Sequence, residues 1–462
     1  MPMTGNELLI LIIPAVLAVL LLALLSLEHL LLLTLFLAPL SLQLSYLTGS
    51  TGFDLSVPTE PVMALLLLIT LFRLTVTRGF PKELLRHPMT WMVGLYLLWT
   101  FITALTSTMP GVSFKTLAYR LWFTAGFYLV AARLAYDERF RKRYILAYAT
   151  GLAVVVIYFI VRVQGAGLLN QQFAHSACYP FYKDHTSFGA SMAFILPPLT
   201  VMLFSRGSLW HRGFLAALLL IFVAGFVLSY SRAAWVSLIA AAALALILWI
   251  RMPVRMLSVS AALFVVVLAL SAGWIWQKMD STTEDSSTDL GQHLRSSSNI
   301  STDQSNLERI NRWKCALRMF AEKPNTGWGP GTYQFRYAPF QKSSERTAIS
   351  TDFGDAGNSH SEYLGALSES GWPGALIYLA MALCAVITGI KVWYREGRGD
   401  KGYFALAVVT GLVTYAVHGV MNSFLDSDKI AALWWGFIAL IVAMDLEGRI
   451  MAGATESDSN PS

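Results

Sequence analysis

Charged residues are scarce in this sequence. Asp, Glu, Lys and Arg make up 13% of its 462 residues, about half of the roughly 25% that soluble globular proteins carry, while 55% of the residues are hydrophobic. Three cysteines are too few to cross-link a chain of this length, and the 33 glycines and 17 prolines follow no period. An ordinary soluble domain, a disulfide scaffold, a disordered chain and a collagen-like chain are therefore excluded. The remaining class is a polytopic membrane protein.

Long apolar runs recur along almost the whole chain. A bilayer core of about 30 Å requires roughly 20 mostly apolar residues per spanning helix. Runs of this kind lie near residues 8–27, 29–47, 60–76, 90–107, 116–134, 144–163, 186–204, 213–231, 233–250, 257–276, 372–392, 404–422 and 429–446. They predict an all-α membrane protein with 12 or 13 transmembrane helices. The number depends on whether the first two runs are two spans or one bent span with a re-entrant piece.

Basic residues are missing from the start of the chain, where none precedes Arg73. A signal peptide begins with a positive region, so we expect the first apolar run to stay in the mature protein. The 34 Lys and Arg against 28 Asp and Glu give a net charge of +6. We use the positions of the basic residues to predict which loops face the cytoplasm, because Lys and Arg favour cytoplasmic loops. The basic short loops are 77–90, 135–143, 205–212, 251–255 and 391–401. The intervening loops, including 277–371, are then predicted to be external.

The composition changes sharply only in the segment 277–371. It holds 12 acidic and 10 basic residues, a net charge of −2, consistent with an external position. We therefore expect four parts: an N-terminal transmembrane bundle (1–276), a partly helical periplasmic loop domain (277–371), C-terminal transmembrane helices (372–446) and a disordered cytoplasmic tail (447–462).

Local signals divide the external segment further. Residues 282–306 are mostly polar and are expected to be mobile. A capping box at Ser305–Glu308 then starts an amphipathic helix, whose apolar residues recur every three or four positions until Pro324. A glycine-rich loop occupies 326–332, and a second capping box at Ser359–Glu362 starts a helix that is expected to end near Gly371.

His360 is the first candidate for chemistry. The second capping box places it at the start of a helix, where the positive end of the macrodipole disfavours the imidazolium form. A neutral imidazole is available as a base near pH 7. The alternative is a surface or capping histidine without a catalytic task.

Arginines form a second group of candidates. Arg232 lies between two apolar runs with almost no loop between them, and an arginine at membrane depth costs roughly 2.5–3.5 kcal/mol on insertion scales, so it usually has a partner or a task. Its alternative is a side chain that snorkels to the interface. Arg309 borders the apolar stripe of the external helix and Arg312 is expected to point further toward solvent, so helix geometry alone favours a solvated face for both.

Other signals are weaker. Gly327, Gly329 and Gly331 lack the Gly-Lys-Ser/Thr ending of a phosphate loop. No pair of side chains has zinc-ligand spacing and no paired acidic motif suggests magnesium, so no metal or other cofactor is predicted. Cys178 and Cys315 fall on the same external side and could pair or remain free. The cluster Lys183-Asp184-His185 could bind substrate or anchor the chain at the interface.

Four motifs together resemble a known family. They are Asn358-Ser-His360-Ser-Glu-Tyr-Leu364 followed by Glu369-Ser-Gly371-Trp-Pro-Gly374, Ser231-Arg232-Ala-Ala-Trp235, Arg309-Ile-Asn-Arg312-Trp313 and Pro324-Asn-Thr-Gly-Trp-Gly-Pro-Gly331. In this order around a large external loop, they resemble the O-antigen ligase and O-antigen polymerase superfamily, over roughly 185–375. Ser361 stands where that family often has Asn.

The resemblance implies a metal-independent, inverting glycosyl transfer from an undecaprenyl-diphosphate-linked glycan at the periplasmic face of the bacterial inner membrane. His360 would be the base that accepts the acceptor proton. A leaving diphosphate gains negative charge, which arginine side chains suit. Arg232 and Arg309 are the expected partners of the diphosphate, with Arg312, Lys183 and His185 as further candidates.

The acceptor stays open at this stage. Transfer to lipid A–core, as by an O-antigen ligase, is the favoured interpretation. An O-antigen polymerase and a protein O-oligosaccharyltransferase are the alternatives within the same chemistry. A transporter of the lipid-linked glycan is the alternative from another class, but transporters usually carry ionisable residues near the midplane of repeated halves. Here the unusual polar residues gather beside one long loop.

Overall fold

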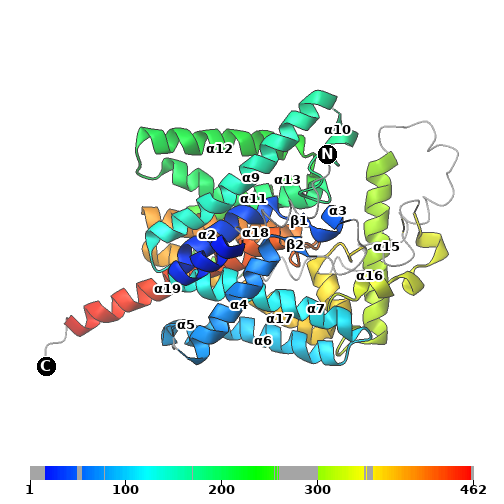
Figure 1. Cartoon of the computed structure of the whole chain (residues 1–462), viewed down its shortest axis with the longest axis horizontal. Helices are drawn as coiled ribbons and strands as arrows, with labels where there is room; N and C mark the ends of the chain where they lie inside the picture. The colour runs from blue at the N-terminus through cyan, green and yellow to red at the C-terminus, as the bar shows by residue number, and fades with distance from the viewer. Residues whose placement is uncertain are drawn as a thin grey trace.

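Helices make up nearly the whole of this computed structural model, which describes residues 16–48, 55–76, 79–168, 170–253, 255–256, 259, 300–347, 350 and 357–458 (Figure 1). Up to residue 166 the elements are Val16–Leu25, α2 (Leu27–Leu37), the 3₁₀ turn η1 (Ala38–Leu40), β1 (Leu42–Gln43), α3 (Leu44–Thr48), β2 (Ser56–Val57), α4 (Thr59–Thr75), α5 (Lys82–Arg86), α6 (Pro88–Leu105), α7 (Pro110–Phe123), the π-helix η2 (Thr124–Val130), α8 (Ala131–Leu134) and α9 (Glu138–Ala166). They are followed by α10 (Gln171–Ala174), α11 (His185–Phe204), α12 (Leu209–Leu228), α13 (Arg232–Trp249), α15 (Ile300–Glu322), α16 (Tyr333–Arg336), η4 (Ala338–Phe340), η5 (Ser343–Glu345), α17 (Glu362–Glu396), α18 (Asp400–His418) and α19 (Asp428–Asp458).

Seven helices among the described residues are long and apolar enough to cross a membrane. They are Pro88–Leu105, Glu138–Ala166, His185–Phe204, Leu209–Leu228, Arg232–Trp249, Glu362–Glu396 and Asp428–Met451. The chain is thus an all-α, multi-pass membrane protein, as the apolar runs predicted. The number of 12 or 13 spans stays a prediction, and the expected run 257–276 lies outside the described residues apart from residue 259.

The expected run 29–47 is not one continuous helix. Helix α2 ends at Leu37, and Pro39 sits in the 3₁₀ turn that follows, because proline lacks the backbone N–H that would continue an α-helix. The chain then forms the two-residue strand β1, which pairs antiparallel with β2. This small ladder lies beside the cavity described below.

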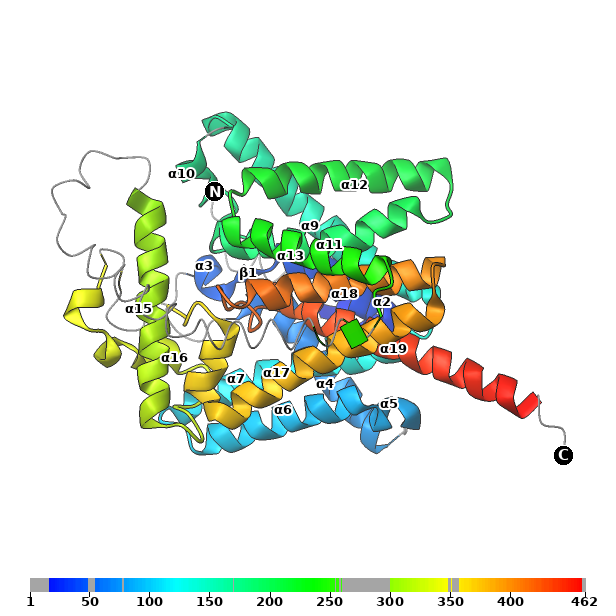
Figure 2. The same ribbon diagram turned by 180° about the vertical axis from the view of Figure 1, so that it is seen from behind.

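Helix α19 lies at the centre of the bundle. Within its apolar window 94% of the residues are buried, as expected for a helix that is hydrophobic on every side. Trp434 and Trp435 are among its fully buried side chains. The helix continues to Asp458 and its C-terminal end projects from the bundle (Figures 1 and 2). Residues 447–458, which we expected in a disordered tail, are therefore helical.

The predicted basic loops meet at one end of the bundle. Arg395 pairs with Asp445 at 2.9 Å and Lys401 with Glu447 at 2.6 Å. Glu447 also accepts a hydrogen bond from Arg141. The loops 135–143 and 391–401 thus contact the same stretch of α19. That this end faces the cytoplasm stays a prediction.

Helix α15 stands at the opposite end, upright against the bundle helices in both views (Figures 1 and 2). It begins at Ile300, so Ser305 lies inside the helix and does not cap it. Serine inside a helix costs less than about 0.7 kcal/mol relative to alanine, and a local capping pattern cannot show how far a helix extends backward. Residues 300–306 belong to this helix and not to the predicted mobile stretch, whose remaining part lies outside the described residues.

Helix α17 joins the external segment to a membrane span. It begins at Glu362 and runs to Glu396, past the end expected near Gly371. Gly371 has φ 68° and ψ −176°, which breaks the helical geometry locally. The predicted helix end is therefore a kink within one longer element.

Candidate functional site

The segment before α17 carries His360. Ser361, not Ser359, is the N-cap of α17, and its side chain accepts from Leu364 N. His360 consequently lies just outside the helix, with φ +50°, and the predicted capping box is shifted by two residues. Its amide N–H donates to Asn358 Oδ1 at 3.0 Å and its carbonyl accepts from Trp313 Nε1 at 3.0 Å. Two side chains therefore fix the backbone of His360.

The imidazole of His360 is neutral at physiological pH. Burial, together with the positive charges of Arg312 and Arg309, lowers its pKa to about 4. The expected neutrality is thus right, but its cause is burial and neighbouring arginines, because His360 precedes the first turn of the helix. Its Nδ1 is buried and has no hydrogen-bond partner among the described residues.

The side chains of α15 face the His360 segment. Arg312 is 4% exposed, so the expectation that it points toward solvent is wrong. Its Nε bonds Glu308 Oε1 at 2.7 Å and its Nη1 donates to the carbonyl of Asn358 at 3.1 Å. The guanidinium also lies over the ring of Tyr337 at 5.0 Å. Arg312 thus ties α15 to the chain two residues before His360.

Arg309 is half-buried one turn earlier on α15. Burial lowers the pKa of its guanidinium, and the carboxylate of Asp184 opposes that shift. The charge of Asp184 also acts on His360. Arg309, Asp184 and His360 therefore share one electrostatic environment, although they come from three distant parts of the sequence.

The start of α11 contributes two histidine rings. Asp184 caps this helix by accepting from Thr186 N at 2.8 Å and Ser187 N at 2.9 Å. His185, the first residue of the helix, stacks on His175 with 3.9 Å between ring centroids. Burial lowers the pKa of His175, and the charge of Arg232 lowers it further.

Arg232 is exposed and is the first residue of α13. The beginnings of α11 and α13 pack closely, because a Cβ on Gly189 would lie 2.7 Å from Ser231 Cβ. The structure therefore brings Arg232 close to the stacked histidines, and Arg309 acts electrostatically on His185.

The glycine-rich loop docks on α17. Trp328 N donates to Ser368 O at 3.0 Å and Gly329 N to Glu369 O at 2.9 Å. The Glu369 carboxylate accepts from Gly331 N at 2.9 Å and Tyr333 N at 3.0 Å. The glycine motif and the Glu-x-Gly motif thus form one structural joint, consistent with the absence of a phosphate-loop signature.

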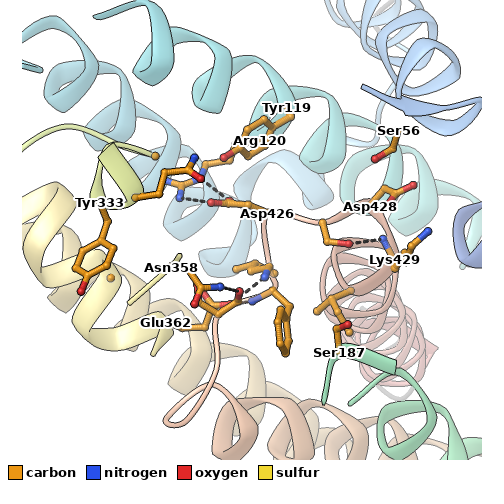
Figure 3. A pocket seen from close by; sticks show the side chains of 18 of the residues that line it. Ser56, Tyr119, Arg120, Ser187, Tyr333, Asn358, Glu362, Asp426, Asp428 and Lys429 are labelled. Atoms are coloured by element: carbon orange, nitrogen blue, oxygen red, sulfur yellow. Dashed lines mark hydrogen bonds and ion pairs between the residues drawn. The ribbon is translucent and has the colours of Figure 1, made fainter. Parts of the chain in front are cut away.

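A cavity of about 1,080 Å³ adjoins the His360 segment. Asn358, Ser359 and Asp184 belong to its wall. Figure 3 shows Arg120 of α7 in a bidentate pair with Asp426, with two N–O distances of 3.1 Å. Lys429 donates through Nζ to the carbonyls of Ser41 at 2.9 Å and Ala38 at 3.1 Å.

The predicted site residues interact electrostatically. Arg309 and Arg312 act on His360, and Arg309 also acts on His185. Arg232 acts on His175, which stacks on His185. Lys183 is exposed and lines the cavity. Sequence reasoning missed four residues of the region: His175, Arg120, Asp426 and Trp122. Asp184 was predicted only as a member of the Lys183–His185 cluster, although an Asp directly before His-Thr-Ser and an apolar run is also a helix-capping pattern.

The cysteines do not pair. Cys178 and Cys315 are both buried free thiols, and burial raises the pKa of each to about 12. Within the described part of the chain, no three His, Cys, Asp or Glu side chains cluster as a metal site would require. The acidic residues of the 277–299 stretch lie outside that part.

The family comparison agrees with the motifs. Residues 215–379 match the family model described as O-antigen ligase, a range that contains Arg232, α15, the glycine-rich loop and His360. No curated protein matches the chain. The chain therefore contains, over residues 215–379, a domain that matches the O-antigen ligase family, and this supports its resemblance to the O-antigen ligase and polymerase superfamily.

Proposed function

We propose that the protein transfers O-antigen glycan from undecaprenyl diphosphate to lipid A–core, without a metal and with inversion at the anomeric carbon. The observation that carries this proposal is the neutral His360 beside two arginines, within a domain of the O-antigen ligase family. The site would face the periplasm from the inner membrane, as the external position of 277–371 predicts.

The transfer would be a single displacement. The acceptor hydroxyl oxygen attacks the anomeric carbon, its proton passes to the imidazole of His360, and the bond from that carbon to the phosphate oxygen breaks. The electron pair stays on the diphosphate, which leaves attached to its lipid. Arg309 and Arg232 would stabilise this growing negative charge with planar, charge-assisted hydrogen bonds.

Diphosphate binding would also tune the base. The charges of Arg309 and Arg312 help to hold the pKa of His360 at about 4, below the range that suits a general base near neutral pH. A bound diphosphate would offset these charges and raise the pKa of His360. The base would therefore become effective mainly when the donor is present.

Arg312 would act differently from Arg309 and Arg232. Its guanidinium already bonds Glu308 and the carbonyl of Asn358. We therefore infer a positioning role, in which Arg312 holds the His360 segment against α15.

The experiment that tests the function is transfer by the purified full chain in lipid nanodiscs. Undecaprenyl-diphosphate glycan would be supplied with lipid A–core or, separately, with a second molecule of donor. Ligated lipid A–core is the expected product. Extension of one donor by another would show a polymerase instead, and movement of donor across a liposome membrane without any transfer would contradict both in favour of a transporter.

A further inference from the structure

The cavity is separate from the arginines that we assign to the diphosphate. Neither Arg232, Arg309 nor Arg312 lines it, whereas Asn358 and Ser359, the two residues before His360, do. The cavity therefore adjoins the proposed base without containing these three arginines, and Lys183 is the one residue among the diphosphate candidates that lines it. At about 1,080 Å³ it lies at the top of the roughly 300–1,000 Å³ typical of small-molecule sites.

The charges of the cavity wall do not suit an anion. Six of the described residues that line it bear carboxyl groups and four bear basic groups: Glu60, Asp184, Glu362, Glu369, Asp426 and Asp428 against Lys115, Arg120, Lys183 and Lys429. Arg120 is engaged by both oxygens of Asp426, and Lys429 by carbonyls of the η1 region. A phosphorylated ligand would meet carboxylates where it needs free cations.

The remaining wall chemistry suits an uncharged polyhydroxylated ligand. Trp99, Trp122, Tyr96 and Tyr119 line the cavity and supply flat apolar faces that carry polar groups at their edges. The Arg120–Asp426 pair presents donors and acceptors side by side, with Asp426 41% exposed (Figure 3). Pockets of this composition fix a ligand by a few placed polar groups on an apolar wall.

Trp122 has an unused donor in this wall. Trp122 Nε1 is buried and has no hydrogen-bond partner among the residues that the structure describes. The indole of Trp99, in contrast, donates to Ser370 O at 2.8 Å. An indole N–H can only donate, and a buried donor without a partner is costly. Trp122 therefore calls for an acceptor oxygen from a ligand.

We propose that this cavity binds uncharged sugar residues of the acceptor glycan, through Trp122 and the Arg120–Asp426 pair, and so presents one hydroxyl to His360. The proposal rests on the proposed function for the identity of the glycan as acceptor, but sugar binding itself does not depend on transfer. Placing the acceptor here leaves the arginines near α15 and α13 to the donor diphosphate.

The first test is binding of soluble oligosaccharide to the full chain in nanodiscs, without donor. The probes are the delipidated core oligosaccharide in its dephosphorylated and its phosphorylated form. Trp122→Phe keeps the ring and removes the N–H, so the dissociation constant of the dephosphorylated probe should rise about 2- to 10-fold, the effect of one neutral hydrogen bond. Trp210→Phe is the matched control, because Trp210 is 92% exposed on α12.

In the transfer assay, Trp122→Phe should raise KM for the acceptor by the same factor and leave KM for the donor unchanged. An increase confined to the donor KM would overturn the assignment, as would unchanged probe binding in Trp122→Phe. If the protein binds the probe as predicted but transfers nothing, the proposed function fails and the cavity assignment stands.

A variant that is expected to bind one probe more tightly gives a result that misfolding cannot explain. Asp426→Asn leaves Arg120 without its carboxylate partner, so the cavity wall loses one negative charge and the guanidinium of Arg120 is released for an anion. Binding of the phosphorylated probe should then strengthen relative to the dephosphorylated one, a shift that a damaged fold cannot produce. An unchanged ratio, or tighter binding of the phosphorylated probe by the unaltered protein, would contradict the charge argument.

Discussion

Gly371 offers a test of how the external loop is held on α17. A Cβ at this position would lie 2.3 Å from Asn325 O and 2.6 Å from Pro324 O, against about 3.5–4.0 Å for an ordinary contact. The 324–325 backbone would have to move by roughly 1 Å. Trp372 N donates to Pro324 O at 2.9 Å, so the same movement would break this bond. We therefore expect Gly371→Ala to loosen the joint between the glycine-rich loop and α17.

The magnitude can be separated into two parts. The backbone of Gly371, with φ 68° and ψ −176°, is unfavourable for any residue with a Cβ and costs about 1–3 kcal/mol. The steric part adds the lost hydrogen bond and an unsatisfied buried group, about 1–3 kcal/mol more. Gly397 has nearly the same backbone, φ 72° and ψ −156°, but its Cβ would meet only the flexible end of Arg251 at 3.3 Å. Gly397→Ala is therefore a control that carries the first part alone.

The assay is thermal unfolding of the purified variants, followed by transfer kinetics. Gly371→Ala should unfold at a lower temperature than Gly397→Ala, and Gly111→Ala, whose Cβ would meet nothing within 4 Å, should match the unaltered protein. Because His360 lies eleven positions before Gly371, a displacement of about 1 Å could lower the rate by about 10²-fold. Equal unfolding temperatures and equal rates for Gly371→Ala and Gly397→Ala would refute the packing argument.

Three further outcomes test the chemistry. His360→Ala should lower turnover by about 10²–10⁴-fold, while donor binding and the His211→Ala control stay near normal. Since the pKa of His360 without donor is lowered to about 4, the base is present above that pH, and kcat/KM for the donor, which reports the free protein, should not fall as the pH drops through 6.5. Arg232→Lys or Arg309→Lys keeps the charge but loses the bidentate fork, so turnover should drop strongly, whereas full activity, equal to an Arg206→Lys control, would favour a structural role. Turnover should survive EDTA and gain little from added magnesium, and restoration by a divalent ion after chelation would disprove the arginine mechanism.

The seven candidate spans among the described residues were predictable because their signal is local. An apolar run of 20 residues reports a buried or lipid-facing helix regardless of its neighbours, and His360 stands in a contiguous motif. The N-cap was misplaced by two residues because Ser359 and Ser361 have the same capping preference. The choice between them depends on the tertiary structure. The Ser361 side chain accepts from Leu364 N, and His360, just before it, has a non-helical backbone with φ +50°.

The burial of Arg312 was not predictable from helix periodicity. The Glu308–Arg312 pair has the i, i+4 spacing that the sequence shows, but the side chain is covered by Tyr337 and by Gly357, where a Cβ would lie 1.7 Å from Arg312 Nη1. The cavity escaped notice for the same reason. Arg120 and Asp426 are 306 positions apart, so no local pattern connects them.

The carboxylate of Glu362 connects the His360 segment to the loop that carries Asp426. Its Oε1 accepts from Phe424 N and Leu425 N at 2.8 Å each and from Tyr415 OH at 2.5 Å. Glu362 is the first residue of α17, two positions after His360, and the loop that it holds continues directly into Asp426. One side chain therefore sets the distance between the proposed base and the proposed sugar-binding pair.

Two replacements of Glu362 should distinguish the effect of its hydrogen bonds from the effect of its negative charge. Glu362→Ala leaves two backbone N–H groups without their acceptor, at about 1–3 kcal/mol each, so the unfolding temperature should fall, KM for the acceptor should rise and kcat should drop. Glu362→Gln keeps one oxygen for the same N–H groups and should retain most of the stability and activity. Glu322→Ala, on the exposed end of α15, controls for the loss of a carboxylate elsewhere. If Glu362→Gln lost as much as Glu362→Ala, the negative charge itself would be required, and a role limited to holding the loop would be wrong.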